Sequence, residues 1–213
     1  MNKPTLIVLK ALVWIACLYP VATLAYGAIV PGSPFDLGPD PTGKIEFATG
    51  LAALRLLVIS LAITPLRQLW SKLSWLIKFR RLLGLFAFFY ASIHLFAYIG
   101  LYAGFDPHTM LADVLKRRFI TVGVLAWLLL VPLALTSTTG AIRRLGGKRW
   151  QQLHKLVYLS VCLGIVHYWW QVKQGVLTPM PITLTMTALF VARPILTWWK
   201  SRNTPKRIQP NPA

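Results

Sequence analysis

Three histidines, His94, His154 and His167, lie inside segments that are otherwise almost entirely apolar. An imidazole within hydrocarbon is energetically costly, and it is usually retained because it binds or transfers something. Two of the three fall in one predicted membrane helix, 13 residues apart, and at about 1.5 Å per residue they are separated by ~20 Å along the axis. This separation suits one metal cofactor near each face of a bilayer, and the chemistry it indicates is electron transfer across the membrane.

Haem iron bound by two neutral imidazoles is six-coordinate and low-spin, with no open position for oxygen or substrate. Such a site exchanges single electrons with little rearrangement, and the porphyrin plane suits a hydrocarbon interior. The predicted helix that contains His94 starts at the inner, cytoplasmic face of the membrane, and His94 lies ~20 Å along it. His167 lies toward the outer end of its own helix. Because the two share a depth near the outer face, we predict that they ligate one haem b from opposite sides.

The third histidine has no partner of its own type at its depth. Fourteen residues before His94, on nearly the same face of that helix, the sequence has Arg80. In an ideal helix His154 and His167 would also point about 140° apart. Either that helix contains a distorted turn or His154 lies at its irregular start. We keep His154 as a third candidate metal ligand and Arg80 as a candidate contact of a second haem or its propionates, so the count of one or two haems stays open.

Three further polar residues are singled out by their surroundings. Arg55 lies about eight positions into the second apolar segment, where an unpaired charge is costly, and it is a candidate partner of haem propionates. Arg193 is expected to extend its guanidinium to the nearby inner interface. His108, beside Pro107 in a connector, is interpreted as a solvated loop residue.

The composition is that of a membrane protein. The 213 residues are 56% hydrophobic and only 13% charged, whereas a soluble domain carries about 25% charged residues. The net charge of +18 comes from 23 Lys and Arg against 5 Asp and Glu. Because these cations cluster in short connectors between apolar segments, they indicate a positively charged cytoplasmic face beside membrane lipid, and not a nucleic-acid interface.

Six apolar stretches approach or exceed the ~20 residues that span a bilayer; they lie near 8–29, 47–66, 82–102, 119–136, 153–172 and 180–199. The first is longer than the core of a signal peptide, which has about 7–15 apolar residues, so we predict a retained helix. The fold class is therefore an all-α membrane protein, a bundle of six transmembrane helices over residues 1–200. Residues 201–213 form a short basic tail, which is predicted to be disordered in the cytoplasm.

The distribution of charge also predicts the orientation. All five acidic residues fall in or beside the first and third connectors, whereas the second and fourth connectors and the C-terminal tail are rich in Lys and Arg. By the positive-inside rule, both termini are then cytoplasmic. The cluster at 116–118 in the third connector is the one feature against this orientation.

Several strings are specific in combination with these histidines: RRLLGL at 80–85, His94 with Tyr98 following, LTST at 135–138, WQQLHKLVYL at 150–159, and His167-Tyr168. Together they closely resemble the haem-binding membrane subunit of the bacterial periplasmic protein-methionine-sulfoxide reductase system, within the wider ferric-reductase and NADPH-oxidase transmembrane group. The resemblance covers the second to fifth helices well and the ends loosely. By motif position His94, His154 and His167 match the family's functional histidines, and Arg80 stands where the wider group has a fourth histidine.

The resemblance implies a b-type cytochrome in the bacterial inner membrane, and a flavin mononucleotide (FMN) is also associated with the family. Such a protein passes electrons from the quinone pool or a cytoplasmic flavin reductase to a periplasmic molybdopterin-containing catalytic subunit, which reduces methionine sulfoxide in oxidised envelope proteins. It has no substrate catalysis of its own, so its status as an enzyme stays open. The alternative is a transporter or proton channel with the histidines as a relay, but the sequence has no inverted-repeat symmetry in its favour.

Overall fold

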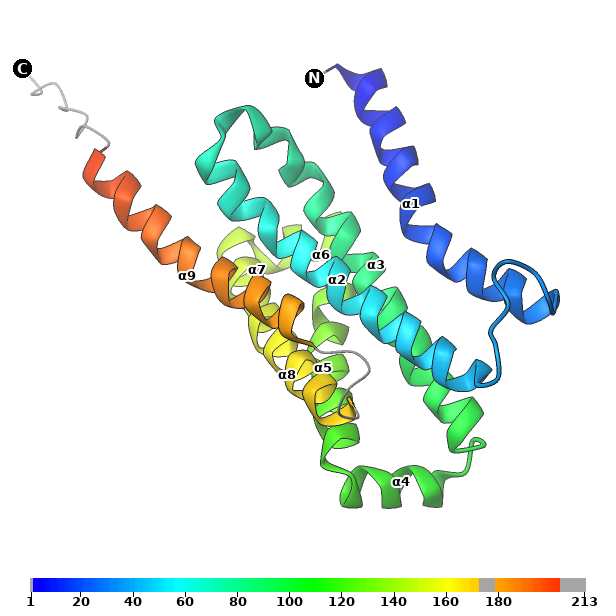
Figure 1. The fold of residues 1–213 in the computed structure, drawn as a ribbon. Coiled ribbons are helices and arrows are strands. Elements are labelled where there is room, and N and C mark those ends of the chain that lie inside the picture. The colour runs from blue at the N-terminus through cyan, green and yellow to red at the C-terminus, as the bar shows by residue number, and fades with distance from the viewer. Residues whose placement is uncertain (1, 173–178, 204–213) are drawn as a thin grey trace, which may run out of the picture.

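A computed structural model of the chain describes residues 2–172 and 179–203, and the regular elements in these ranges are all helical (Figure 1). The long helices are α1 (Lys3–Ile29), α2 (Pro41–Leu69), α3 (Ile77–Ala97), α5 (Arg118–Leu135), α8 (Leu156–Gln171) and α9 (Met180–Asn203). Shorter elements connect them: the 3-10 helix η1 (Ser71–Leu76), the π-helix η2 (Tyr98–Tyr102), α4 (Pro107–Lys116), α6 (Thr139–Leu145) and α7 (Gly147–Leu153). The start of α1 and the end of α9 lie at one end of the bundle, referred to below as the inner end, and α4 lies at the opposite, outer end (Figure 1).

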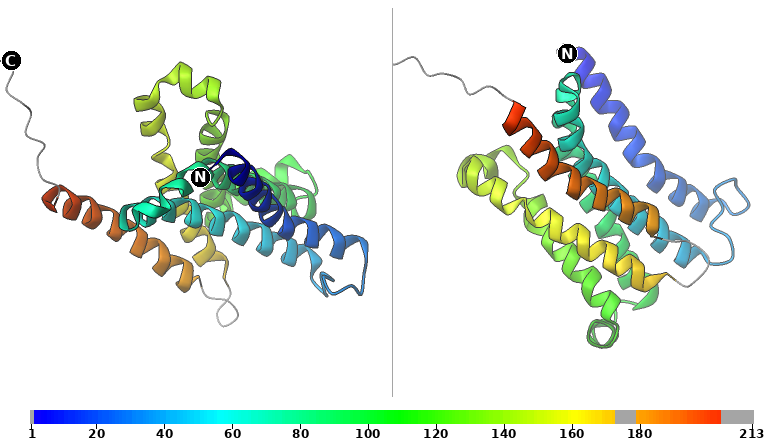
Figure 2. Two further views of the ribbon diagram at one scale, coloured as in Figure 1. Left: turned by 90° about the horizontal axis from the view of Figure 1, so that it is seen from above. Right: turned by 60° about the vertical axis from the view of Figure 1, so that its left-hand side comes forward.

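Helix α2 is the centre of the bundle. Its apolar face packs against α3, α5, α8 and α9, and a second cluster joins it to α1 and α3. The buried side chains of the main cluster are Leu54, Leu57, Val58, Leu61, Ala87, Leu130, Leu133, Val161 and Met186. Viewed from above, α6 and α7 project from the side of the bundle (Figure 2). One packed core therefore holds helices α3, α5, α8 and α9 against α2.

The number of long apolar helices differs from the prediction. Among the described residues five helices are long and apolar enough to cross a membrane: α1, α2, the continuous segment Ser71–Tyr102, α5 and α9. The expected span at 153–172 instead yields α8, which has 16 residues. At about 1.5 Å per residue it is ~24 Å long, because the chain turns at His154 and Lys155 and α7 does not continue into it. The count of six spans thus stays a prediction.

The ends and connectors also differ from the predicted boundaries. Helix α9 continues to Asn203, so residues 201–203, which the prediction placed in the disordered tail, are helical. Residues 204–213, the rest of that tail, lie outside the described residues. The third connector contains α4, which Asp106 caps by accepting hydrogen bonds from the backbone N–H groups of His108 and Thr109. His108 is therefore exposed on the first turn of a helix, and its placement in a loop was wrong.

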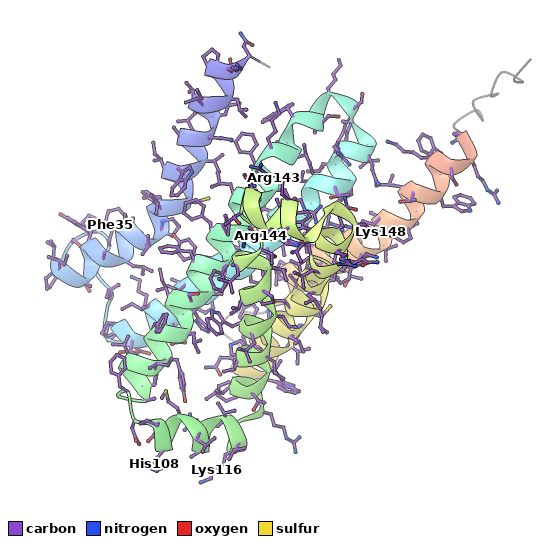
Figure 3. The ribbon with its side chains drawn as sticks, turned by 180° about the vertical axis from the view of Figure 1, so that it is seen from behind. Phe35, His108, Lys116, Arg143, Arg144 and Lys148 are labelled. Atoms are coloured by element: carbon purple, nitrogen blue, oxygen red, sulfur yellow. The ribbon has the colours of Figure 1, made fainter. Side chains whose placement is uncertain are left out.

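The charges separate along the bundle as the sequence predicts. All five acidic residues lie at the outer end, in the α1–α2 connection, the first turns of α2, or α4 and the residue that caps it: Asp36, Asp40, Glu46, Asp106 and Asp113. Arg143, Arg144 and Lys148 lie on α6 and α7, well away from His108 and Lys116 on α4 (Figure 3). The inner end therefore carries cations without acidic neighbours.

A buried hydroxyl adds to the apolar contacts that attach helix α1 to the bundle. Pro20 lies inside α1 and has no N–H, which interrupts the hydrogen-bond ladder of the helix. Tyr90 on α3, which is fully buried, donates its hydroxyl to the Cys17 carbonyl at 2.6 Å and accepts the Val21 N–H at 3.1 Å. The side chain of Tyr90 thereby satisfies backbone groups on both sides of Pro20, which cannot turn to water inside a membrane.

We expect Tyr90→Phe to lower the free energy of unfolding by about 1–3 kcal/mol, because it leaves buried backbone groups unpaired without changing the ring. The measurement is the thermal unfolding midpoint of the purified protein. Tyr19→Phe is the matched control, since Tyr19 lies on the same helix α1 and is 60% exposed. Equal midpoints for the two variants would show that the hydroxyl bridge does not stabilise the fold.

Candidate haem site

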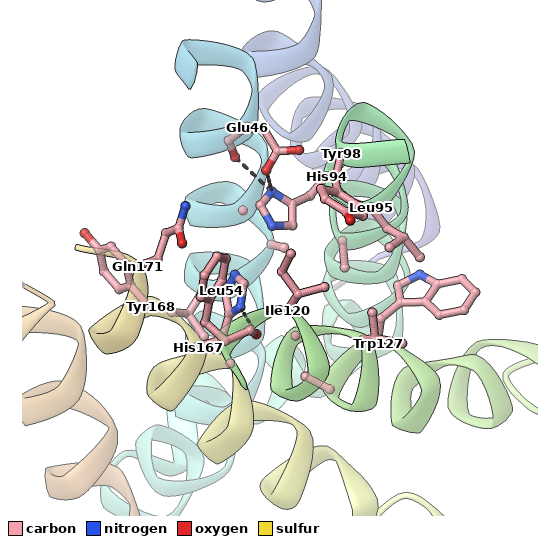
Figure 4. A pocket seen from close by; sticks show the side chains of 18 of the residues that line it. Glu46, Leu54, His94, Leu95, Tyr98, Ile120, Trp127, His167, Tyr168 and Gln171 are labelled. Atoms are coloured by element: carbon pink, nitrogen blue, oxygen red, sulfur yellow. Dashed lines mark hydrogen bonds and ion pairs between the residues drawn. The ribbon is translucent and has the colours of Figure 1, made fainter. Parts of the chain in front are cut away.

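Two of the three candidate histidines meet at the outer half of the bundle. His94 lies near the end of α3 and His167 near the end of α8, and their ring centroids are 5.8 Å apart with an angle of 85° between the planes. Both rings lie between α2, α3, α5 and α8 (Figure 4). The shared depth that helix rise predicts is therefore accompanied by direct approach of the two rings.

Each imidazole is anchored in the same way. The Nδ1–H group of His94 donates to the Glu46 carbonyl at 2.9 Å, and that of His167 donates to the Phe119 carbonyl at 2.7 Å. A carbonyl oxygen only accepts hydrogen bonds, so in the neutral ring the proton is on Nδ1 and the lone pair is on Nε2. This is the tautomer in which a histidine binds a metal through Nε2, with its other nitrogen held by an outer partner.

A glycine makes each of these anchors possible. Gly50 on α2 and Gly123 on α5 lie four residues after Glu46 and Phe119, respectively. A Cβ atom on Gly50 would come within 3.0 Å of the His94 ring, and one on Gly123 within 2.7 Å of His167 Nδ1. Both distances are shorter than ordinary van der Waals contact. The rings therefore lie directly against the backbone of the facing helix, in space that any side chain would fill.

The two rings line a cavity of ≈ 420 Å³, which is within the usual range of about 300–1,000 Å³ for ligand sites. Its walls are mostly apolar, with Leu54, Leu95 and Ile120 among them, and its polar lining residues include Glu46, Tyr98 and Gln171 (Figure 4). Arg117 also lines it. An ion held by two imidazole nitrogens at about 2 Å each needs ring centres roughly 6 Å apart. The observed separation, the anchored tautomers and the apolar walls fit a haem between His94 and His167.

The carboxylate of Glu46 distinguishes the His94 side of the site. Its Oε2 lies 3.3 Å from His94 Nδ1, beside the backbone carbonyl of the same residue, and both side chains are largely buried. Its Oε1 is buried and has no hydrogen-bond partner among the described residues. Within residues 2–172 and 179–203, the Phe119 carbonyl is the one hydrogen-bond partner of His167 Nδ1. A carboxylate beside a ligating imidazole increases the basicity of the ligand, so the two histidines are not equivalent.

A short polar chain borders the cavity at the outer end. The Tyr98 hydroxyl donates to Asp113 Oδ2 at 2.8 Å, and Arg117 Nε lies 3.0 Å from Asp113 Oδ1. Tyr98 and Arg117 both line the cavity. One member of the cationic cluster at 116–118, which argued against the predicted orientation, thus has a local role at the cavity. A cation and a phenol at the edge of an apolar cavity are suitable partners for carboxylates.

The third histidine lies apart from this pair, in the turn between α7 and α8. Of the two explanations for its helical phase, the irregular helix start is confirmed. His154 Nδ1 donates to the Trp150 carbonyl at 3.0 Å, and the Trp150 ring lies over the imidazole at 3.9 Å. Its Nε2 is buried and has no hydrogen-bond partner among the described residues. Arg80, the residue in place of a fourth histidine, is within electrostatic range and donates to the Thr64 hydroxyl at 3.4 Å.

The structure places Arg55 outside the cavity between His94 and His167. It is exposed on α2 and lines a neighbouring groove between α2, α8 and α9. Phe47, Leu51 and Tyr168 line both spaces. The contact between Arg55 and haem propionates therefore stays a prediction, whereas Arg117 lines the cavity itself.

Reasoning from the sequence missed Gly50, Gly123, Glu46 and Arg117. A signal for the glycines was present, because glycine inside a helix costs about 1 kcal/mol relative to alanine and usually has a packing reason. Gly50 and Gly123 both lie in apolar helices near the outer end, at the depth expected for the histidine pair. For Glu46 and Arg117 the sequence indicated only a connector charge.

The sequence is similar to known transmembrane proteins. Residues 49–165 match the family described as the ferric reductase like transmembrane component. The protein-methionine-sulfoxide reductase heme-binding subunit MsrQ of Herminiimonas arsenicoxydans is 45% identical over 201 residues, covering 93% of this chain and 90% of the relative. The protein of the same name from Caulobacter vibrioides is 43% identical over 199 residues, with 93% and 90% covered. That from Xanthomonas campestris pv. campestris is 50% identical over 179 residues, with 82% and 80% covered.

No solved structure matches the chain significantly. The sequence relatives nevertheless cover nearly the whole chain at high identity, and the matched transmembrane component contains two of the three candidate histidines, His94 and His154. We conclude that the chain belongs to the MsrQ family, the heme-binding subunits of protein-methionine-sulfoxide reductase, within the ferric-reductase-like transmembrane proteins.

Proposed function

We propose that the chain is a membrane electron carrier that holds haem b between His94 and His167 and delivers electrons at the outer face of the membrane. The observation that carries this proposal is the approach of the two imidazoles to 5.8 Å, each with Nδ1 bound to a backbone carbonyl of a facing helix. That arrangement leaves two Nε2 lone pairs for one metal. The name of the relatives, heme-binding subunits, points to the same cofactor.

Bound haem would supply single-electron exchange without an open coordination position. The residues of the chain would bind and orient it. His94 and His167 would hold the iron, Gly50 and Gly123 would let the rings approach the backbone, and the apolar walls would exclude water. We assign Arg117 and Tyr98 to the propionates, because both line the cavity at its outer side. No described residue needs to act on a substrate in this role.

We further propose that His154 ligates a second haem in the inner half of the bundle. Its Nδ1 donates to the carbonyl of Trp150 in the preceding helical turn, and not to one of a facing helix, and its Nε2 is buried without a partner among the described residues. An orphaned nitrogen in an apolar setting is costly, and metal ligation would remove that cost. Arg80 would stand beside this haem instead of a second histidine.

The proposed location is the bacterial inner membrane, with both termini in the cytoplasm. The inner end, at which α1 begins and α9 ends, carries cations without acidic neighbours, as the positive-inside rule requires of a cytoplasmic face (Figure 1). We propose that α8 completes a sixth crossing together with the turn before it. Its 16 residues are close to the lower limit of about 17 for a span.

The partner we propose is a periplasmic molybdopterin-containing catalytic subunit that reduces methionine sulfoxide. The relatives' name implies a methionine-sulfoxide reductase to which the heme-binding subunit belongs. The histidine pair at the outer end would place the electron close to such a partner. The quinone pool or a cytoplasmic flavin reductase is the proposed donor. An FMN, which the resemblance alone implies, stays a prediction that the flavin content of the purified protein would test.

The test of the carrier is a dithionite-reduced minus oxidised absorption spectrum of the purified protein. We expect sharp bands of low-spin haem b, because two imidazoles at one iron give a low-spin site. The ratio of haem to protein then gives the number of haems, with one from the His94–His167 pair and a second from His154. A flat difference spectrum would exclude the carrier and favour the transporter or proton channel.

A further inference from the structure

Two arginines extend into the inner half of the bundle from different helices. Arg193 on α9 donates to the Tyr158 hydroxyl and to the Leu61 carbonyl, and its guanidinium lies over the Tyr158 ring at 4.9 Å from the centroid. The expectation that Arg193 extends to the interface was therefore wrong. The side chain turns inward because α8 and α2 offer it an aromatic face and two oxygen acceptors.

The second arginine approaches the same stretch of α2. Arg80 on α3 donates to the Thr64 hydroxyl at 3.4 Å, and Thr64 is three residues after Leu61. Positions three residues apart lie on one face of a helix. The two guanidinium groups are close enough for their charges to interact, and Arg80 also interacts with His154. Helices α2, α3, α8 and α9 thus bring two like charges together.

These charges have no acidic counterpart. All five Asp and Glu residues of the sequence fall within 36–46 and 106–113, at the outer end of the bundle. Among the described residues, the acceptors that bind Arg80 and Arg193 are neutral: the hydroxyls of Thr64 and Tyr158 and the carbonyl of Leu61. Charged side chains at membrane depth pair with an opposite charge or with backbone carbonyls, and the Leu61 carbonyl serves Arg193 in this way. A neutral acceptor does not cancel the charge, so no acidic side chain of the sequence offsets the repulsion between the two guanidiniums.

One buried donor also lacks a partner at this place. Arg193 Nε is buried and has no hydrogen-bond partner among the described residues. His154 Nε2 is likewise unpartnered, but with the proton on Nδ1 it carries a lone pair and does not donate to an anion. The Nε–H group of an arginine is a donor with a fixed direction beside its terminal nitrogens, which suits a two-oxygen acceptor. A buried unpaired donor beside positive charge favours an anion as its partner, because one oxygen can accept the Nε–H while the negative charge offsets that of the guanidiniums.

We propose that Arg80 and Arg193 form a binding site for an oxyanion, a carboxylate or a phosphate, carried by an amphiphilic molecule beside His154. Two sources share this chemistry: a propionate of a haem and the phosphate of a membrane lipid. The propionate source rests on the proposed second haem at His154, whereas the lipid source is independent of it. Neither source involves the His94–His167 pair.

The variants Arg193→Gln and Arg80→Gln test the site in the purified full-length protein. Arg202→Gln is the matched control, because Arg202 lies on the same helix α9, is exposed, and has its guanidinium over Trp198 at 4.2 Å. Two pairs of probes distinguish the lipid source from the propionate source. The first compares binding of short-chain phosphatidate with that of short-chain phosphatidylcholine at constant ionic strength. The second compares binding of haem with that of its dimethyl ester, in which the propionates carry no charge.

We expect the wild type and Arg202→Gln to bind at least one anionic probe at least tenfold more tightly than its neutral counterpart. This preference should vanish in Arg193→Gln and in Arg80→Gln. A preference for phosphatidate alone identifies the lipid, and a preference for haem over its ester identifies the propionate. If Arg193→Gln does not fold, Arg193→Lys is the substitute, because it keeps the positive charge but cannot bind two oxygens at once as a guanidinium does. Its preference for the anionic probe should be severalfold smaller than that of the wild type.

Equal preference in the wild type, Arg193→Gln and Arg80→Gln for both probes would overturn the proposal. Where Arg193→Lys replaces an unfolded Arg193→Gln, a preference for the anionic probe as large as that of the wild type would also overturn the proposal. The outcome is distinguishable from failure of the carrier function, since none of these substitutions touches the histidine pair at the outer end. Absence of low-spin haem bands from the wild-type protein would contradict the carrier function. The bands of the His94–His167 haem are expected in every arginine variant, whether or not that variant prefers the anionic probes.

Discussion

Replacement of either His94 or His167 by alanine should abolish haem binding in the outer half of the bundle. The two rings are 5.8 Å apart and each is fixed by its Nδ1 hydrogen bond, so one ring alone leaves the iron with a single protein ligand. We expect a loss of at least one haem per chain and of the matching low-spin bands. The measurement is the haem-to-protein ratio together with the reduced minus oxidised spectrum.

The control for these substitutions is His108→Ala. His108 is exposed on α4, and its ring has no contact with the cavity among the described residues. The variant should keep the full haem content and spectrum. His154→Ala should leave the outer haem in place and remove a second one if two are bound. Full retention of haem in both His94→Ala and His167→Ala would refute the pairing.

The second large effect is expected from a single methyl group. In Gly123→Ala the added Cβ would lie 2.7 Å from His167 Nδ1 and 2.9 Å from its Cε1, so the ring must leave the Phe119 carbonyl. We expect haem binding to weaken by at least tenfold, since the ring loses the orientation that its hydrogen bond provides. Haem affinity of the purified protein and the position of the low-spin bands are the readouts.

The loss of haem affinity should be larger where an added Cβ lies closer to the histidine ring. Gly50→Ala places its Cβ 3.0 Å from the His94 ring and should have a smaller effect than Gly123→Ala. Gly84→Ala on α3 is the control, because no atom lies within 4 Å of the added Cβ. Alanine there should keep haem binding and stabilise the helix by up to about 1 kcal/mol. The same haem affinity in all three variants would show that close approach to the backbone is not required.

The depth of the histidine pair follows from the sequence, whereas the conformation at His154 does not. Helix rise and the expected direction of each span were enough to place His94 and His167 at one depth, because both quantities are properties of the chain itself. For the poor helical phase of His154 relative to His167, the sequence left two explanations, a distorted turn within the helix or an irregular helix start. The structure has a turn at His154 and Lys155 between α7 and α8, which is an irregular helix start.

Side-chain direction was predicted less well than depth. Arg193 was expected at the interface, but it contacts Tyr158 and Leu61 inside the bundle, since two other helices supply its partners. Arg55 was expected near the haem; it lines a groove that adjoins the cavity, and its contact with the propionates stays a prediction. A long flexible side chain reaches several places from one backbone position, and only the neighbouring helices determine which of them offers a partner.

The sequence by itself determined the membrane setting, the all-helical class, the separation of acidic and basic ends and the depth of the histidine pair. These follow from composition, from the length of apolar segments and from the fixed rise of a helix, which act locally. Only the tertiary structure decided which backbone carbonyls hold the imidazoles, why Gly50 and Gly123 must lack a side chain, and where Arg80 and Arg193 meet. Those features join residues far apart in the chain, and they depend on how closely and at what angle the helices pack.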